Sequence, residues 1–259
     1  MNGLKWLWTL IYGDSSIGRK ARIAITGLLM CGFLVSHLAG NLLLFKGDDG
    51  ESYNNYAKFL HSGEMEAVIA GAEVGLLVLF GVHLLLALVT TRENTAARPT
   101  GYAMKQSKQG DSVLAAPAYN VMLLTGIVVF AFLVLHLVDF RFRARVSSHE
   151  PVPVVERVDV AHANKHQPIT RTDAIRLLRD PLTSGVYIVG CLVLGYHLVH
   201  GFYSAFQTLG FNHPRYTPKL RLLSIVFAIV IGVGFAVFPV WAHFVTIPGD
   251  APAAPATTP

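Results

Sequence analysis

Charged residues and cysteines are scarce in this chain of 259 residues, and each scarcity excludes a class of protein. Asp, Glu, Lys and Arg together make up 14% of the residues, whereas an ordinary soluble domain carries about 25%. Because 53% of the residues are hydrophobic, the low charge does not indicate disorder either. Two cysteines are too few for a disulfide framework or a four-thiolate metal site.

A secretory signal peptide is also not expected, because residues 1–22 are aromatic and basic and lack a small-residue cleavage site. The net charge of +5 could indicate nucleic-acid binding. The basic residues, however, lie between long apolar runs, where they are better explained by membrane topology. We therefore expect membrane lipid, and no nucleic acid, among the partners.

Long apolar runs are what the sequence has in abundance. Five of them approach or exceed the roughly 20 residues that cross a bilayer as a helix; they cover residues 23–45, 67–90, 118–140, 185–206 and 222–245. We predict an all-α integral membrane bundle of five transmembrane helices over residues 1–247. The Ala/Pro/Thr-rich tail at 248–259 is predicted to be flexible.

Prolines and polar segments punctuate these runs. Pro117 and Pro181 precede the third and fourth runs, where proline suits a helix start. Pro239 lies inside the fifth run and is expected to kink it. Residues 141–184 are rich in Pro, His and charge, which predicts an extramembrane loop with a short helix near 172–178.

The distribution of Lys and Arg predicts the orientation. With a cytoplasmic N-terminus, the inner segments hold eleven basic residues and the short outer segments hold two. The positive-inside rule applies best to such short segments, so we predict that the N-terminus is cytoplasmic. Three arginines at the outer edge, Arg141, Arg143 and Arg145, run against the rule.

Histidines occur inside the predicted spans, where an ionisable side chain is costly and indicates a function. His37 and His136 fall in the outer halves of the first and third spans, since each lies well beyond the start of an outward-running helix. His83 and His197 fall in the inner halves of the second and fourth spans. The four histidines thus sort into two levels, with two at each level.

An internal repeat accompanies the outer histidines. Residues 26–38 and 125–137 share seven identities in thirteen positions, including Thr-Gly at the start and FLV before the histidine. A weaker sequence similarity relates residues 81–84 to residues 195–198, and it favours His197 over His200 as the partner of His83.

Two histidines that face each other at one depth suit a bis-imidazole haem, because the iron takes a neutral ring nitrogen from each side. With both axial positions filled, such a haem carries electrons and binds no substrate at the iron. Two haems b at two levels would link the faces of the membrane. Small residues near the histidines would admit a porphyrin or, alternatively, close helix packing; they are Gly40, Gly190 and Gly201.

Several stretches resemble the cytochrome b membrane anchor of bacterial succinate dehydrogenases and fumarate reductases, in its one-subunit, five-helix, di-haem form. The resemblance covers about 15–239, is weak in 141–184, and is carried by 15–20, 26–28, HLAGNL at 37–42, YHLVHGF at 196–202, 204–210 and 212–213.

That resemblance implies the role of the chain in respiratory complex II. The chain would anchor a flavoprotein subunit and an iron–sulfur subunit at the cytoplasmic face of a bacterial inner membrane. Electrons from succinate would reach a quinone, either menaquinone or ubiquinone. His83 and His197 would hold the inner haem, and His37 and His136 the outer one. A higher oligomer of heterotrimers is a further implication, and no residue of this chain would act on the dicarboxylate.

Other residues follow from these expectations. His200 is read as a haem-edge residue. Some fumarate reductases of the family have a glutamate two residues before the fourth-span histidine, and Gly195 in that place favours succinate oxidation. Arg19 and Arg22 inside, and Arg141 or Arg143 outside, are candidate partners for haem propionates. Candidate quinone residues near the outer haem are Glu73, His61, Glu64 and Glu66. Candidate docking segments are 1–18, 92–112 and 208–219.

Three alternatives stay open. Cys31 and Cys191 with two histidines could ligate a Rieske-type cluster, although each cysteine lies six residues before a histidine and so on a different helix face. A histidine-lined proton or metal transporter would place a polar pathway at the midplane. Another quinone-linked di-haem anchor would share the haem arrangement but not the motif after His197.

Overall fold

The protein is all-α in the part of the chain that the structure describes. This computed structural model describes residues 15–97, 118–145 and 168–247. Those ranges contain seven α-helices, one 3-10 turn and one π turn, and no strand. Five of the helices are long and apolar enough to cross a membrane. The predicted fold class is therefore confirmed, and the chain has the character of a multi-pass membrane protein.

The five long helices match the predicted runs and extend them. Their bounds are α2 Ser16–Asn41, α4 Gly63–Ala96, α5 Ala118–His136, α8 Pro181–Thr208 and α9 Thr217–Ala242. The 3-10 turn η1 (Leu42–Phe45) prolongs α2, and the π turn η3 (Leu137–Arg141) prolongs α5. The residues added at the starts of α2, α4, α8 and α9 are mostly polar and precede the apolar runs, so hydropathy alone could not include them.

Helix starts follow local chemistry. The Ser15 side chain caps α2 by accepting from the amide of Gly18 at 3.0 Å. Pro181 is the first residue of α8, as predicted, and the preceding Asp180 accepts from the amide of Thr183 at 2.8 Å. Pro239 lies inside α9 as expected. The prediction for Pro117 concerns a residue outside the described ranges, as do those for 1–14, 98–112 and the tail.

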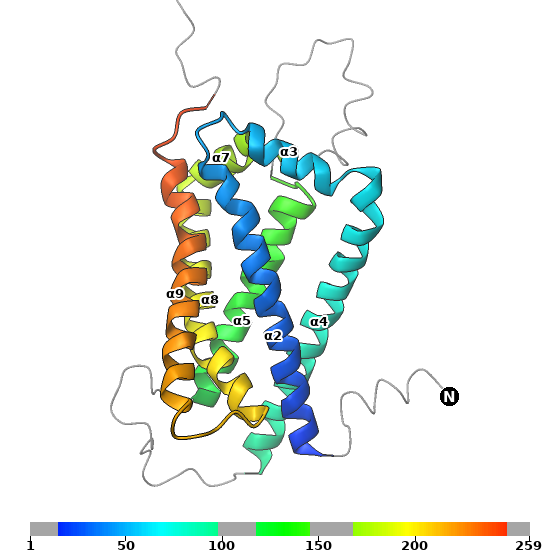
Figure 1. Cartoon of the computed structure of the whole chain (residues 1–259), viewed down its shortest axis with the longest axis vertical. Helices are drawn as coiled ribbons and strands as arrows, with labels where there is room; N and C mark the ends of the chain where they lie inside the picture. Colours follow the sequence, from blue (N-terminus) through cyan, green and yellow to red (C-terminus); the bar gives the residue numbers. More distant parts are fainter. Residues whose placement is uncertain (1–14, 98–117, 146–167, 248–259) are drawn as a thin grey trace, which may run out of the picture.

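The long helices stand side by side in one bundle (Figure 1). α9 packs along α8 on one side of the bundle, α2 and α5 occupy the centre, and α4 lies on the opposite side against α2. In Figure 1, α2 begins at the lower end of the bundle and finishes at the upper end. We use "lower end" and "upper end" in this sense below.

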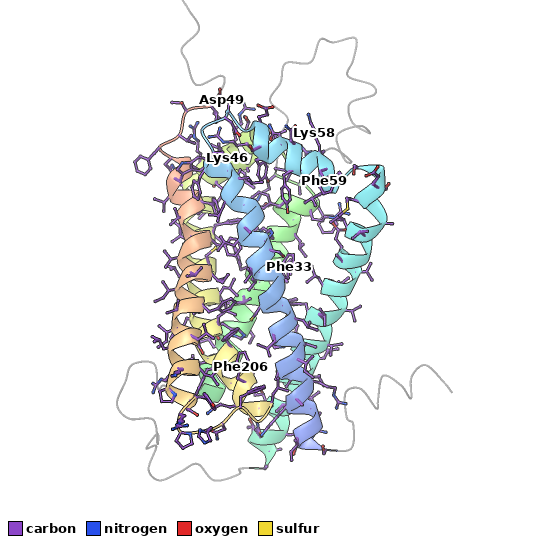
Figure 2. The ribbon with its side chains drawn as sticks, viewed as in Figure 1. Phe33, Lys46, Asp49, Lys58, Phe59 and Phe206 are labelled. Carbon is purple, nitrogen blue, oxygen red and sulfur yellow. The ribbon has the colours of Figure 1, made fainter. Side chains whose placement is uncertain are left out.

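The outer surface of the bundle is apolar along its length. Every long helix exposes large hydrophobic side chains, for example Leu29, Leu77, Leu124, Leu192 and Val226. Figure 2 shows Phe33 at mid-height, whereas Lys46, Asp49 and Lys58 gather at the upper end. An apolar girdle with charges beyond its end is the pattern that lipid contact requires.

Two short helices lie across the upper end of the bundle (Figure 1). α7 (Arg171–Arg179) confirms the predicted short helix at 172–178 and begins with a Thr170–Asp173 capping box. α3 (Glu51–Leu60) was not predicted, because it is amphipathic and too short and polar for a span. It starts after Gly50, whose positive φ of 94° suits glycine and where a Cβ would lie 2.8 Å from the Arg171 side chain.

Arginines of α7 hold this cap in place. The buried Arg171 donates from Nε to the carbonyl oxygen of Leu44 at 3.0 Å and lies over the Trp241 ring. Arg179 donates to the carbonyl oxygens of Ala242, the last residue of α9, at 2.9 Å, and of Val245, just after α9. The charged cap thus satisfies backbone groups that a helix end leaves unpaired.

The α8–α9 interface depends on two facing glycines. A Cβ built on Gly232 would lie 2.9 Å from Gly195 Cα, and one built on Gly195 would lie 3.0 Å from the Ala228 carbonyl oxygen. Small residues of this kind let helix backbones approach closely within a membrane. Gly195 therefore has a packing role, and a glutamate could not replace it without separating the helices.

Candidate functional site

The upper histidine pair lies at the centre of the bundle. His37 of α2 and His136 of α5 have ring centroids 5.8 Å apart and nearly perpendicular planes. Aromatic rings surround them: Phe33 stacks on His37, and Phe132, Phe140 and Tyr187 contact His136. The two imidazoles predicted to share the outer level are thus brought together.

The lower histidines each contact a threonine of a neighbouring helix. His83 Nδ1 of α4 lies 3.1 Å from Thr26 Oγ1 of α2. His197 Nδ1 of α8 lies 3.0 Å from Thr125 Oγ1 of α5. His197 is also close enough to His83 to interact with it electrostatically. Both rings therefore lie near the starts of α2 and α5, at the lower level.

These contacts group the four helices that carry the histidines into two equivalent halves. α2 with α4 forms one half, and α5 with α8 forms the other. In each half a Thr-Gly pair meets a histidine of the second helix, and the first helix carries its own histidine eleven residues further on. At 1.5 Å per residue the two levels are separated by about 16 Å along the axis. The repeat seen in the sequence thus corresponds to a structural repeat.

Glycines at the lower level leave room for the rings. A Cβ on Gly27 would lie 3.3 Å from His83 Cε1, and one on Gly126 would lie 3.6 Å from His197 Cε1. The sequence had shown both glycines as part of the repeat without assigning them a role. The sequence likewise assigned no role to Thr26 and Thr125, because the histidines they bond are 57 and 72 residues away along the chain.

Among the described residues, buried polar atoms that find no hydrogen-bond partner there occur on three helices toward the lower end. They are Arg22 Nε and Nη2, Thr90 Oγ1 and His200 Nε2. Such atoms are costly to bury and call for a partner. Arg22 precedes Thr26 by one turn, and His200 follows His197 by one turn, so these groups border the lower histidines. Arg19, the other inner arginine candidate, forms an ion pair with Glu93 of α4 at 2.5 Å.

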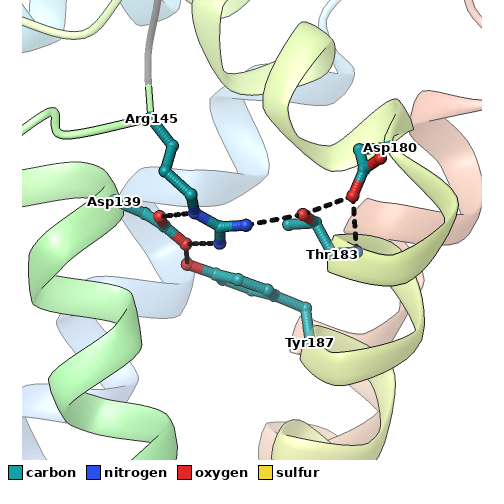
Figure 3. A network of polar contacts seen from close by, with 5 residues as sticks. All are labelled: Asp139, Arg145, Asp180, Thr183 and Tyr187. Carbon is teal, nitrogen blue, oxygen red and sulfur yellow. Dashed lines mark hydrogen bonds and ion pairs between the residues drawn. The ribbon is translucent and has the colours of Figure 1, made fainter.

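An ion pair between a buried carboxylate and a partly exposed arginine lies beside the upper histidine pair (Figure 3). Asp139, in the π turn three residues after His136, is fully buried and accepts from Arg145 Nε and Nη2, each at 2.5 Å. The Tyr187 hydroxyl donates to the same carboxylate at 2.7 Å. Hydrogen bonding to Asp139 raises the pKa of Arg145. Arg145 also donates to Thr183, which donates to Asp180.

Sequence reasoning did not single out Asp139, because it stands at the last turn of the third apolar run. The sequence did contain a signal for Asp139, because this carboxylate is close in sequence to a histidine and to three arginines. The π turn that points it inward cannot be read from apolar periodicity, and such turns are common at functional sites.

The quinone candidates are spread over the upper end. Glu73 forms a two-point ion pair with Arg141, at 2.9 Å for both contacts, so these two predicted residues bind each other. His61 Nδ1 lies 2.9 Å from the Ala57 carbonyl oxygen of its own helix. Glu64 and Glu66 are exposed in the first turn of α4. The structure does not gather the four into one site.

The three glycines proposed for porphyrin contact face protein side chains. A Cβ on Gly40 would lie 2.9 Å from the Tyr56 ring, and one on Gly190 would lie 2.4 Å from the Phe132 ring. A Cβ on Gly201 would lie 3.6 Å from Met122 Cε, its nearest neighbour outside the helix backbone. Gly40 and Gly190 thus admit aromatic rings from α3 and α5.

Cys31 and Cys191 are buried and unbridged. Within the described ranges, no group of three or more His, Cys, Asp or Glu side chains could hold a metal ion by itself. The ligand set of a Rieske cluster, two cysteines and two histidines, is therefore not assembled in those ranges.

Comparison of the chain with protein-family models, curated proteins and solved structures gives no match. Fold and site therefore define the class: an α-helical multi-pass bundle with paired intramembrane histidines at two levels.

Proposed function

We propose that this chain is the membrane-anchor cytochrome b subunit of a succinate:quinone oxidoreductase and holds two b haems between its helices. The sequence resemblance suggests this family, and the positions of the histidines are consistent with the proposal. The proposal places the protein in a bacterial cytoplasmic membrane with the lower end of the bundle, and hence its N-terminus, on the cytoplasmic side.

The observation that carries the proposal is the placement of one histidine pair at each of two levels about 16 Å apart. His37 with His136, and His83 with His197, would hold the two haem irons. Each pair takes its members from the two halves of the bundle, so a planar group between the halves would meet one imidazole on either side. When bound, the two groups would supply a path for single electrons through the membrane.

The lower end also offers partners for carboxylates. Arg22 and His200 keep buried nitrogen atoms that have no hydrogen bond to any part of the chain that the structure describes, and an arginine is the preferred partner of a carboxylate. These residues fit haem propionates of the lower site. At the upper end, Arg141 is paired with Glu73, so a propionate there would compete with that carboxylate.

The partner subunits would bind at the lower end. The connection between α8 and α9 exposes Phe211 and Tyr216 in the candidate docking segment 208–219. Exposed aromatic side chains beyond the apolar girdle suit a protein interface. The flavoprotein and iron–sulfur subunits would supply the succinate chemistry, and this chain would deliver electrons to a quinone.

A haem count tests the proposal. A pyridine haemochrome assay and a reduced-minus-oxidised spectrum on gently extracted protein should give two b haems per chain. His83→Ala should remove the lower haem and His37→Ala the upper one, whereas His213→Ala, in an exposed connection, should leave both. Protein from its native membrane without haem would overturn the proposal. One haem, together with acid-labile sulfide, would favour the Rieske alternative.

A further inference from the structure

The two lower histidines share a hydrogen-bond arrangement that the sequence repeats. In each half of the bundle, histidine Nδ1 lies 3.0–3.1 Å from the hydroxyl oxygen of a threonine on the neighbouring helix. The upper histidines lie among aromatic rings instead. The threonine contact is therefore specific to the lower level.

The direction of these hydrogen bonds follows from proton counting. A threonine hydroxyl has one proton to donate. Thr26 Oγ1 directs its proton to the Arg22 carbonyl oxygen at 2.8 Å, and Thr125 Oγ1 directs its own to the Val121 carbonyl oxygen at 2.8 Å. Each hydroxyl oxygen is then an acceptor toward the histidine, so Nδ1 carries the hydrogen.

A second contact independently supports this tautomer for His83. Its Nδ1 also lies 3.2 Å from the carbonyl oxygen of Ile23, which can only accept. With the hydrogen on Nδ1, the neutral ring keeps its free lone pair on Nε2. Nε2 is therefore the atom of each ring that can bind a metal ion.

We propose that Thr26 and Thr125 are positioning residues that fix His83 and His197 as Nδ1–H tautomers with Nε2 directed to a shared haem iron. This inference rests on the proposed function. The adjacent glycines are part of the same arrangement, since Gly27 leaves space for the His83 ring and Gly126 leaves space for the His197 ring. Partners of this kind orient a ligating histidine and raise its basicity.

The two halves differ in one respect that sharpens the test. His83 has both Thr26 and the Ile23 carbonyl oxygen as acceptors. Among the described residues, Thr125 is the one hydrogen-bond partner of His197. Loss of the Thr125 hydroxyl should therefore affect the lower site more than loss of the Thr26 hydroxyl.

The experiment is a potentiometric titration of the full-length protein in its complex, followed in the b-haem absorption bands. Thr125→Val removes the hydroxyl at nearly constant shape. The less basic His197 then stabilises ferric iron less, so the midpoint potential of the lower haem should rise. A tenfold change in the relative stability of the two iron states corresponds to 59 mV for one electron, and a shift of that order is expected. Thr26→Val should give a smaller rise.

Two controls separate the hydroxyl from packing. Thr125→Ser keeps the hydroxyl and should retain the wild-type potential. Thr170→Val removes a hydroxyl at an exposed position of the upper end, far from the lower histidines, where it accepts from the amide of Asp173 at 3.2 Å. It should leave both haems unchanged.

An unchanged lower-haem potential in Thr125→Val would overturn the inference, and so would loss of that haem in Thr125→Val and Thr125→Ser alike. Loss of the haem in the valine variant alone would support it. In apoprotein, ¹⁵N shifts of labelled histidine should report Nδ1–H rings at positions 83 and 197, and Nε2–H rings would overturn the inference. Absence of haem from the wild-type complex would instead refute the proposed function.

Discussion

Replacement of Asp139 by alanine should destabilise the protein far more than replacement of Glu73. Both carboxylates make a two-point ion pair with an arginine, Arg145 and Arg141 respectively, but their surroundings differ. The Asp139 side chain is 0% exposed, whereas the Glu73 side chain is 43% exposed.

The magnitude follows from what each replacement leaves behind. Removing one partner of a buried ion pair costs about 3–5 kcal/mol. Arg145 is 40% exposed and regains water, which reduces this cost. The buried Tyr187 hydroxyl loses its acceptor, at about 1–3 kcal/mol. We expect a loss of about 3 kcal/mol for Asp139→Ala, and at most about 1 kcal/mol for Glu73→Ala because exposed pairs contribute little.

Reversible unfolding in mixed micelles with increasing SDS measures both free energies of unfolding under the same conditions. Asp139→Asn should fall between the wild type and the alanine variant, because the amide oxygen still accepts from Tyr187. Equal losses for Asp139→Ala and Glu73→Ala would refute the reasoning that burial decides the strength of these pairs.

Two further predictions concern the helix contacts and pH. Gly232→Ala should cost about 1–3 kcal/mol in the same unfolding assay, because its Cβ would lie 2.9 Å from Gly195 Cα. Gly75→Ala is the control and should cost nothing, since a Cβ built there meets no described residue outside its own helix turn within 4 Å. Equal effects of the two substitutions would contradict the close α8–α9 contact. Hydrogen bonds from Thr183 lower the pKa of Asp180 from its usual 3.8, so its stabilising effect is present above that value and is lost as pH falls through the lowered pKa. The unfolding midpoint should therefore depend less on acid pH in Asp180→Asn than in the wild type, and identical profiles would contradict this.

Much of the fold could be predicted because a membrane span needs a long apolar run, and five such runs are present. Helix ends were harder to predict, since α2 begins at Ser16, seven residues before the apolar run, under a serine cap. The amphipathic α3 was missed for the same reason, because hydropathy does not register a short helix that covers a bundle end.

The histidine levels could be predicted from helix rise, since each histidine has a defined distance from a helix end. Their partners could not, because Thr26 meets His83 only when α4 packs on α2. Likewise, the pairing of Arg141 with Glu73 depends on where the π turn after His136 directs the chain. Contacts between helices are set by packing, which no single segment encodes.

The cap formed by α7 has a consequence for biogenesis. α7 precedes α8 and α9 in the chain, yet Arg179 binds the carbonyl oxygens of the last residue of α9 and of Val245 beyond it, and Arg171 lies over Trp241 of α9. During synthesis these parts of α9 emerge after α7. The contacts of Arg179 and Arg171 with α9 can therefore form only once α9 has been inserted, so closure of the cap reports the insertion of α8 and α9.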